Sequence, residues 1–272
     1  MDKYCVFGNP IEHSLSPLIH SMFAKQTGHN FLYKKILAPI DSFEKDVKSF
    51  INNNGKGFNI TLPFKMRAFA MAEKTTPRAK IAQAVNTMKI EKNILYGDNT
   101  DGIGLVEDFN KNIKVSLKDK DILIIGAGGA TRGIIFDLIQ QNPLRILVAN
   151  RTTAKAEKIA LDFQKYNKVC GFSLAQIKAK PVDIVINATS IGINNKEIIN
   201  IPKLVAKNAF CYDLMYGKET AFIKWSKQAN ASGVSDGLGM LVEQAAQAYF
   251  IWHKVMPDTK RDLSHLKETI YQ

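Results

Sequence analysis

The chain contains little cysteine and no long apolar run. Its three cysteines, Cys5, Cys170 and Cys211, lie far apart and match no metal-ligand spacing. This argues against a metal site or a disulfide-stapled fold and favours a reducing environment. No apolar stretch approaches the roughly 20 residues of a membrane-spanning helix, and the opening residues MDKYCVFGNP lack the layout of a signal peptide. We therefore expect a cytoplasmic protein with no metal and no membrane partner.

Acidic residues are scarce relative to basic ones. The 272 residues include 37 Lys and Arg against 25 Asp and Glu, which gives a net charge of +12. The lysines are spread along the whole chain and form no basic patch interleaved with aromatic residues, so we do not expect nucleic acid as the main partner. A generally basic protein instead attracts an anionic small-molecule substrate and a phosphate-rich cofactor.

The segment DILIIGAGGATRGIIFDLI, residues 121–139, is the most informative pattern in the chain. A continuous apolar run, typical of a buried parallel strand, leads into a glycine turn and then into a helical pattern. The turn contains Gly126, Gly128 and Gly129. Their uncovered amides and the following helix N-terminus favour an anion such as a pyrophosphate. We predict a dinucleotide site here, although a glycine turn can also simply join a strand to a helix.

The third position of the usual glycine pattern is Thr131. Ala130 or Gly133 would then provide the close packing between helix and strand. The order of strand, turn and helix still favours the dinucleotide site over the simple connection.

The residues after the next predicted strand, 144–149, indicate which cofactor binds. An NAD enzyme usually has an Asp or Glu at this point to hold the ribose hydroxyl, whereas this chain has Asn150-Arg151-Thr152. Arg151 and Lys155 are basic, and a guanidinium binds a 2′-phosphate through paired hydrogen bonds. The pattern predicts NADP rather than NAD, with a solvated basic loop as the alternative.

Strand and helix patterns alternate along the chain, which predicts an α/β fold of two domains. We expect a flanking α/β substrate domain at 1–103, a central Rossmann-type domain with a doubly wound parallel sheet at 104–236, and C-terminal helices at 237–272 that pack back on the first domain. The predicted strands are 4–7, 31–37, 57–61, 86–91, 121–125, 144–149, 168–172, 182–187 and 209–213; the helices before the glycine turn are 17–27, 42–52, a helical region 65–83, and 102–112.

Further short patterns are distributed over nearly the full length: GNPIEHSLSP (8–17), NITLPFK (59–65), AVNT (84–87), GDNTDG (97–102), NATSIG (187–192), YDLMY (212–216) and GLGMLVEQAA (237–246). Together with GAGGATRG (126–133) and NRT (150–152), and in this order, they make the chain resemble the shikimate dehydrogenase family. The resemblance implies reversible NADP-dependent reduction of 3-dehydroshikimate to shikimate, a step toward chorismate and the aromatic amino acids.

The resemblance implies that Lys65 and Asp101 form the catalytic pair. An ammonium stabilises the alkoxide that develops on ketone reduction and supplies a proton, while a carboxylate orients it and accepts a hydrogen bond from a substrate hydroxyl. Taken alone, Lys65 would be a surface lysine and Asp101 a helix cap. Asp98 is the nearest competitor for the acidic role.

The remaining site residues are also assigned through the resemblance. Ser14, Ser16 and Tyr216 would hold the substrate carboxylate, although Ser16-Pro17 also reads as a helix N-cap followed by Pro. The ring hydroxyls would meet Lys65, Asp101 and three neutral polar side chains, Thr61, Asn86 and Gln244. The cofactor would contact Gly126, Ala127, Gly128, Gly129, Ala130, Asn150, Arg151, Thr152, Thr153, Ala154, Lys155, Leu214 and Gly237, with Asn187 to Ser190 nearby.

Two positions depart from the family pattern. Residue 77 is Pro where some relatives carry an acidic residue near the cofactor, and residue 155 is Lys where Arg is frequent. The open alternatives are a quinate/shikimate dehydrogenase of broader substrate and cofactor specificity, and a non-catalytic NADP-binding or nucleic-acid-binding protein with the same fold. We expect a monomer or a homodimer.

Overall fold

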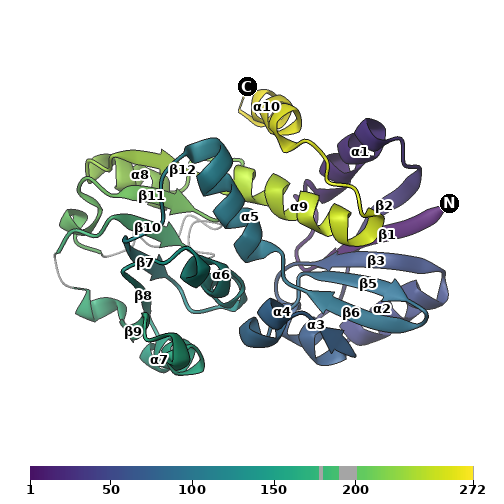
Figure 1. Ribbon diagram of the computed structural model, residues 1–272, viewed down its shortest axis with the longest axis horizontal. Coiled ribbons are helices and arrows are strands. Elements are labelled where there is room, and N and C mark those ends of the chain that lie inside the picture. Colours follow the sequence, from purple (N-terminus) through teal and green to yellow (C-terminus); the bar gives the residue numbers. More distant parts are fainter. Residues whose placement is uncertain (178–179, 190–200, 272) are drawn as a thin grey trace.

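The computed structural model describes residues 1–177, 180–189 and 201–271. These residues form two six-stranded sheets with helices on their faces, and two of the helices, α5 (Asp101–Asp108) and α9 (Leu238–His253), run between the sheets (Figure 1). Ser190 and the rest of the 187–192 pattern beyond residue 189 lie outside the described residues. The predicted α/β class with a doubly wound parallel sheet, a flanking sheet and C-terminal helices is confirmed.

The first sheet is mixed and has the order β2-β1-β3-β5-β6-β4. Strand β1 pairs in parallel with β2 and β3, whereas β5 pairs antiparallel with β3 and β6. The strands are β1 (Asp2–Gly8), β2 (Phe31–Leu37), β3 (Gly55–Ile60), β4 (Lys74–Thr75), β5 (Thr87–Glu91) and β6 (Ile94–Asp98), and the helices are α1 (Ser16–Thr27), α2 (Phe43–Asn52), α3 (Lys65–Met71) and α4 (Pro77–Ala82). Buried aromatic side chains, Phe7, Phe43, Phe58 and Phe64, fill its core.

Two expectations for this sheet are incomplete. The region 65–83 is two short helices separated by β4, because Thr76 caps α4 and Pro77 opens it. Strand β6 was not predicted. It forms a hairpin with β5 through Lys92 and Asn93, both at positive φ (51° and 62°), and this pair lacks the glycine that usually signals such a turn.

The second sheet is wholly parallel, with the order β12-β11-β10-β7-β8-β9. Its strands are β7 (Asp121–Ile125), β8 (Arg145–Asn150), β9 (Val169–Ser173), β10 (Ile184–Asn187), β11 (Phe210–Asp213) and β12 (Gly233–Ser235), and its helices include α6 (Gly129–Gln140), α7 (Thr153–Asp162) and α8 (Ala221–Gln228). The strand order reverses between β7 and β10, and ligands gather at such a switch point beyond the strand carboxyl ends.

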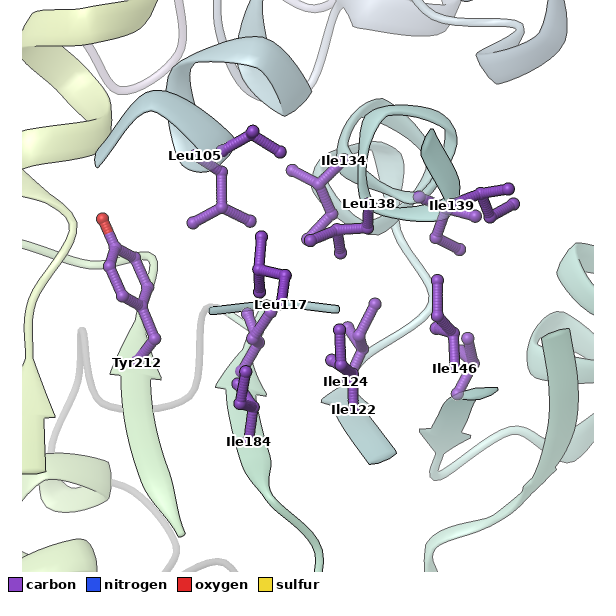
Figure 2. Packing of buried hydrophobic residues seen from close by; sticks show 14 of the residues in the cluster. Leu105, Leu117, Ile122, Ile124, Ile134, Leu138, Ile139, Ile146, Ile184 and Tyr212 are labelled. Carbon is purple, nitrogen blue, oxygen red and sulfur yellow. The ribbon is translucent and has the colours of Figure 1, made fainter. Parts of the chain in front are cut away.

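The apolar run of β7 is continuous because both faces of this strand are covered. Ile122 and Ile124 point toward Leu138 of α6 and the cluster that also holds Leu105 of α5 (Figure 2). The alternate residues of β7 belong to a second cluster on the opposite face, which contains Phe222 and other side chains of α8.

The chain returns to the first sheet after completing the second. The apolar face of α9 is largely buried, and it packs with α1 and α10 (Thr259–Ile270) through Ile19, Phe23 and Leu266. At its far end, Trp252 of α9 donates to Met88 O of β5 at 2.9 Å. Helices α9 and α10 therefore complete the core that lies over the first sheet.

A buried polar network joins α5, α9 and β11. Tyr212 of β11 donates to Asp108 Oδ2 at 2.6 Å and accepts from Met240 N–H at 3.3 Å. Asn112 donates to the other carboxylate oxygen of Asp108 at 2.8 Å. The helix that begins at Asp101 is thereby tied to the second sheet.

Candidate active site

Lys65 and Asp101 lie together although 36 positions separate them in the sequence. Lys65 Nζ donates to Asp101 Oδ2 at 2.5 Å. Both side chains are largely shielded, with exposed fractions of 14% and 7%. Lys65 is the first residue of α3, directly after the Thr61-Leu62-Pro63-Phe64 turn at the end of β3, and Asp101 opens α5. The carboxylate caps no helix, because its oxygens accept hydrogen bonds from Lys65 and Asn86, so the helix-cap interpretation is wrong.

Asp98, the competing carboxylate, is fully engaged in structural contacts. Arg78 of α4 donates to both of its oxygens, at 2.7 and 2.8 Å, and Thr76 donates to Oδ1 at 2.6 Å. A bidentate guanidinium pair of this kind holds a carboxylate in one orientation. Asp98 therefore anchors α4 to β6, whereas Asp101 faces Lys65.

Asn86 connects the Lys65–Asp101 pair to α9. Its Nδ2 donates to Asp101 Oδ1 at 2.7 Å and lies 3.3 Å from Gln244 Oε1, while its Oδ1 accepts from Thr100 N–H at 2.8 Å. Gln244 belongs to α9 and remains half-buried. Three of the polar residues singled out from the sequence, Asn86, Asp101 and Gln244, thus form one network with Lys65.

The two serines of the first motif lie at the start of α1. Ser16 N–H donates to Ser14 Oγ, and the two hydroxyl oxygens are 3.3 Å apart. Ser16 is the first residue of α1 rather than its N-cap, because Leu15 occupies the cap position and no side chain caps the helix. Its hydroxyl is therefore not used by the helix end.

Tyr216 reaches this end of the site from the loop after β11. Burial raises the pKa of the Tyr216 phenol, and a hydrogen bond with the backbone of Leu15 opposes that rise. Tyr216 therefore lies beside the residue that separates Ser14 and Ser16. Thr61, half-buried at the end of β3, packs its methyl group closely against Gly8.

Two residues behind the site were not singled out from the sequence. Asn59 of β3 donates to Thr87 Oγ1 at 3.0 Å and accepts from Tyr33 at 2.7 Å. Burial raises the pKa of the Tyr33 phenol, and its contact with the Ser16 hydroxyl opposes the rise. Asn59 opens the quoted NITLPFK pattern, which is the only signal that pointed to it.

The glycine turn faces this site from the second sheet. Gly126 is held at φ +110°, and a Cβ on Gly128 would meet nothing within 4 Å, so the amides at the start of α6 are open to an anion. Ala127, Gly129 and Ala130 of the same turn are half-buried. A Cβ on Gly129 would lie 3.9 Å from Lys65 Cβ, so the turn and the lysine are neighbours. These features fit the pyrophosphate of a dinucleotide.

Thr131 and Gly133 have separate tasks in α6. Thr131 is buried and donates to Gly126 O at 2.9 Å, which fixes the turn. A Cβ on Gly133 would lie 2.9 Å from Asp101 Oδ2, so Gly133 provides close packing against α5 and the Asp101 carboxylate. The departure from the usual glycine pattern is therefore accommodated, although the close contact is with a helix and not with a strand.

The other expected cofactor residues surround the same edge of the sheet. Asn150 ends β8 and donates to Thr152 O at 2.9 Å, while Arg151, Thr152, Ala154 and Lys155 are exposed and Thr153 opens α7. Leu214 follows β11, and a Cβ on Gly237 would lie 2.4 Å from its carbonyl oxygen. Leu214 and Gly237 are thus adjacent. At the end of β10, buried Asn187 donates to Asp213 Oδ1 at 2.9 Å and accepts from Thr189.

Asp137 of α6 is a half-buried carboxylate beside the Lys65–Asp101 pair. Burial raises the pKa of Asp137 to about 6, with Asp98 and Asp101 adding to the rise and Arg78 opposing it. In the unfolded chain the carboxyl has its ordinary pKa of 3.8, so between pH 3.8 and about 6 the folded protein binds a proton at Asp137 that the unfolded chain does not bind. Above about pH 6 the side chain is ionised in both states, and its ionisation then lowers the free energy of unfolding by the full amount. As pH falls to about 4 this destabilisation disappears.

We predict that Asp137→Asn raises the free energy of unfolding by about 1–3 kcal/mol above pH 6 and adds nothing below pH 4. Urea titrations from pH 4 to 8 measure this gain, with exposed Asp41→Asn as the control. A gain of equal size at every pH would show that removal of the charge is not responsible.

Neither a metal cluster nor a membrane-spanning helix occurs in the part of the chain that the structure describes. No group of three or more His, Cys, Asp or Glu side chains there is placed to hold a metal ion. None of the described helices is long and apolar enough to cross a bilayer.

Family models match three segments of the chain. The shikimate dehydrogenase substrate binding domain matches residues 6–88, shikimate/quinate 5-dehydrogenase matches residues 108–215, and the shikimate 5′-dehydrogenase C-terminal domain matches residues 237–266. The matched segments contain Lys65 and Asn86, the glycine turn, and Gln244 respectively.

Full-length relatives agree with these matches. A shikimate dehydrogenase (NADP(+)) of Ruthia magnifica subsp. Calyptogena magnifica is 55% identical over 98% of this chain and 100% of its own length. The Ael1 enzyme from Pseudomonas putida superposes with a TM-score of 0.90 at 37% identity, covering 98% of both chains. Shikimate 5-dehydrogenase from Thermus thermophilus, in complex with NADP(H) and shikimate, has a TM-score of 0.87 at 30% identity and covers 98% of this chain and 99% of its own. The chain belongs to the NADP-dependent shikimate dehydrogenase family.

Proposed function

We propose that the protein catalyses the reversible, NADP-dependent reduction of 3-dehydroshikimate to shikimate, a step toward chorismate and the aromatic amino acids. The contact of 2.5 Å between Lys65 and Asp101, beside the glycine turn of the second sheet, carries this proposal. Lys65, as proton donor, and Asp101, as the carboxylate that orients it, lie next to the glycine turn, which fits the pyrophosphate of a dinucleotide. The working division is a substrate domain at 1–103 with the helices of 237–272, and a cofactor domain at 104–236.

Lys65 and Asp101 handle the proton in the proposed mechanism. Bound NADP(H) supplies or accepts the hydride. In the reducing direction the Lys65 ammonium stabilises the negative charge that develops on the ketone oxygen and donates a proton to it. Asp101 holds the ammonium in place and accepts a hydrogen bond from a substrate hydroxyl. Asn86 fixes the other oxygen of Asp101, so the carboxylate is oriented before the substrate arrives.

The neutral side chains of the site would select the substrate. The hydroxyls of Ser14, Ser16 and Tyr216 offer donors for a carboxylate at one end. At the other end Thr61, Asn86 and Gln244 offer donors and acceptors for ring hydroxyls. A site built to hydrogen-bond hydroxyls rejects analogues that lack them, because its buried polar groups would be left unpaired.

Arg151 and Lys155 would hold the 2′-phosphate of NADP. Both are exposed at the end of β8 and the first turn of α7. We expect Arg151→Ala to raise the KM for NADPH by about 10- to 100-fold, because it removes charge-assisted hydrogen bonds to the phosphate. The KM for NADH should not change. Exposed Lys158→Ala, one turn further along α7, serves as the control. The assignment fails if the KM for NADPH is unchanged and NADH works equally well.

The proposed reaction is tested by following NADPH formation from shikimate and NADP⁺, and NADH formation from shikimate and NAD⁺, in one spectrophotometric series. Turnover with shikimate and NADP⁺ is expected. Equal rates with quinate or with NAD⁺ would favour the broader quinate/shikimate dehydrogenase. Absence of shikimate-dependent NADPH formation, together with salt-dependent retention on DNA, would favour the non-catalytic alternative.

We also propose that the enzyme is cytoplasmic and that it is a monomer or a homodimer. Light scattering after gel filtration would distinguish the two oligomeric states.

A further inference from the structure

Tyr271, after the last turn of α10, joins two segments that flank the proposed carboxylate site. Its hydroxyl donates to Asp236 Oδ2 and accepts from Gly217 N–H at 3.2 Å. The same carboxylate oxygen also accepts from Gly217 N–H at 3.3 Å, so the Tyr271 phenol, the Asp236 carboxylate and the Gly217 amide form a set in which each group is hydrogen-bonded to the other two. Asp236 Oδ1 accepts from Leu238 N–H at 3.3 Å, which places this set at the start of α9.

The set holds the residue that follows Tyr216. Gly217 is the neighbour of Tyr216 in the loop after β11, and its amide is the group that Tyr271 and Asp236 share. Tyr216 itself packs into the cluster formed by α1, α9 and α10, where Leu15 and Ile270 also lie. A shift of Gly217 would therefore move the phenol of Tyr216 relative to Ser14 and Ser16.

Helix α10 supplies a rigid support for this contact. Leu263 and Leu266 are buried in the same cluster as Ile19 and Phe23 of α1, the helix that Ser16 opens. Tyr271 is therefore fixed on the side of the two serines, whereas the loop that it holds belongs to the second sheet. In Figure 1, α10 lies over α9 on the side of α1.

We propose that Tyr271 is a positioning residue that holds the 214–217 loop so that the Tyr216 phenol meets the substrate carboxylate beside Ser14 and Ser16. This inference rests on the proposed function, because it assigns the carboxylate of shikimate to that end of the site. Tyr271 does not touch the reacting atoms, and it acts on substrate affinity through Tyr216.

The expected effect is confined to substrate binding. Tyr271 is half exposed, and loss of one hydrogen bond to a charged group at such a position corresponds to a change in KM of about 3- to 10-fold. Tyr271→Phe keeps the ring and removes only the hydroxyl. We expect it to raise the KM for shikimate by that factor, while kcat and the KM for NADP⁺ change by less than about twofold.

A double-mutant cycle identifies the route of the effect. If Tyr271 acts through Tyr216, then Tyr271→Phe should change the KM for shikimate by less than about twofold once Tyr216 is Phe. Tyr166→Phe is the matched control, since Tyr166 packs with Phe136 and Phe163 in the second domain and its hydroxyl has no hydrogen bond among the described residues. Its KM for shikimate should equal that of the parent in both backgrounds.

Amide hydrogen exchange of Gly217 tests the positioning separately from activity. Exchange should be faster in Tyr271→Phe and unchanged in Tyr166→Phe. Unchanged exchange, an unchanged KM, or an equal rise in KM in both backgrounds overturns the inference. A parent protein that forms no NADPH from shikimate overturns the proposed function and the substrate part of this inference, and the exchange result still decides whether Tyr271 holds the loop.

Discussion

Replacing Lys65 by alanine is expected to lower kcat by about 10²- to 10⁴-fold, with little change in the KM for shikimate. The variant loses the group that donates the proton and stabilises the developing alkoxide, whereas the side chains proposed to hold the carboxylate and ring hydroxyls remain. Steady-state kinetics in both directions measure the effect. Because Lys65 and Asp101 act on one transition state, the loss should appear in kcat and in kcat/KM alike.

The control for this experiment is Lys80→Ala, which removes an exposed lysine from the neighbouring helix α4. Its kinetics should match those of the parent, so that a loss in Lys65→Ala cannot be attributed to lower net charge. Near-normal turnover of Lys65→Ala would remove Lys65 from the mechanism.

Gly104→Ala is expected to destabilise the protein. Helix α5 crosses α9 at this glycine, and an added Cβ would lie 2.6 Å from Gln244 Cβ and 2.7 Å from Gln244 N. Backbone atoms of α9 must move to admit the methyl group. Alanine normally favours a helix by about 1 kcal/mol over glycine, yet here we expect a net loss of about 1–3 kcal/mol and a fall in Tm of roughly 3–10 °C.

Gly129→Ala is the matched control for stability, since Gly129 also lies in a helix but an added methyl group would make only an ordinary contact, 3.9 Å from Lys65 Cβ. Calorimetry of the free protein should show its Tm unchanged or slightly raised. Equal behaviour of the two alanine variants would mean that the α5–α9 crossing tolerates separation. Gly104→Ala should also raise the KM for shikimate, because the displaced residue is Gln244.

The glycine turn could be predicted from the sequence because all its information is local. An apolar strand, three glycines and a helix follow one another within twenty residues, and the amides they expose belong to the same segment. The prediction of NADP rather than NAD also uses local information, namely the absence of an acidic residue at Asn150-Arg151-Thr152. The C-terminal helices of 237–272 were likewise predicted from their own segment.

The proposed catalytic pair could not be derived from local pattern, since the sequence around Lys65 predicts a surface lysine and that around Asp101 predicts a helix cap. Only the resemblance over the full length selected them, and only the fold shows that α3 and α5 begin at the same place. Asp98 illustrates the reason: its engagement by Arg78 depends on how α4 packs on β6, which no spacing specifies. Tyr33 and Tyr271 were missed for the same reason, because their partners are remote in the chain.

The most direct test of the account is a crystal structure of the protein with shikimate and NADP⁺ bound. We expect Lys65 Nζ within about 2.6–3.2 Å of the hydroxyl that is oxidised, Asp101 beside the same ring, and the nicotinamide on the face turned toward Gly237. A complex in which shikimate contacts neither Lys65 nor Asp101, or in which the nicotinamide lies away from them, would contradict the account.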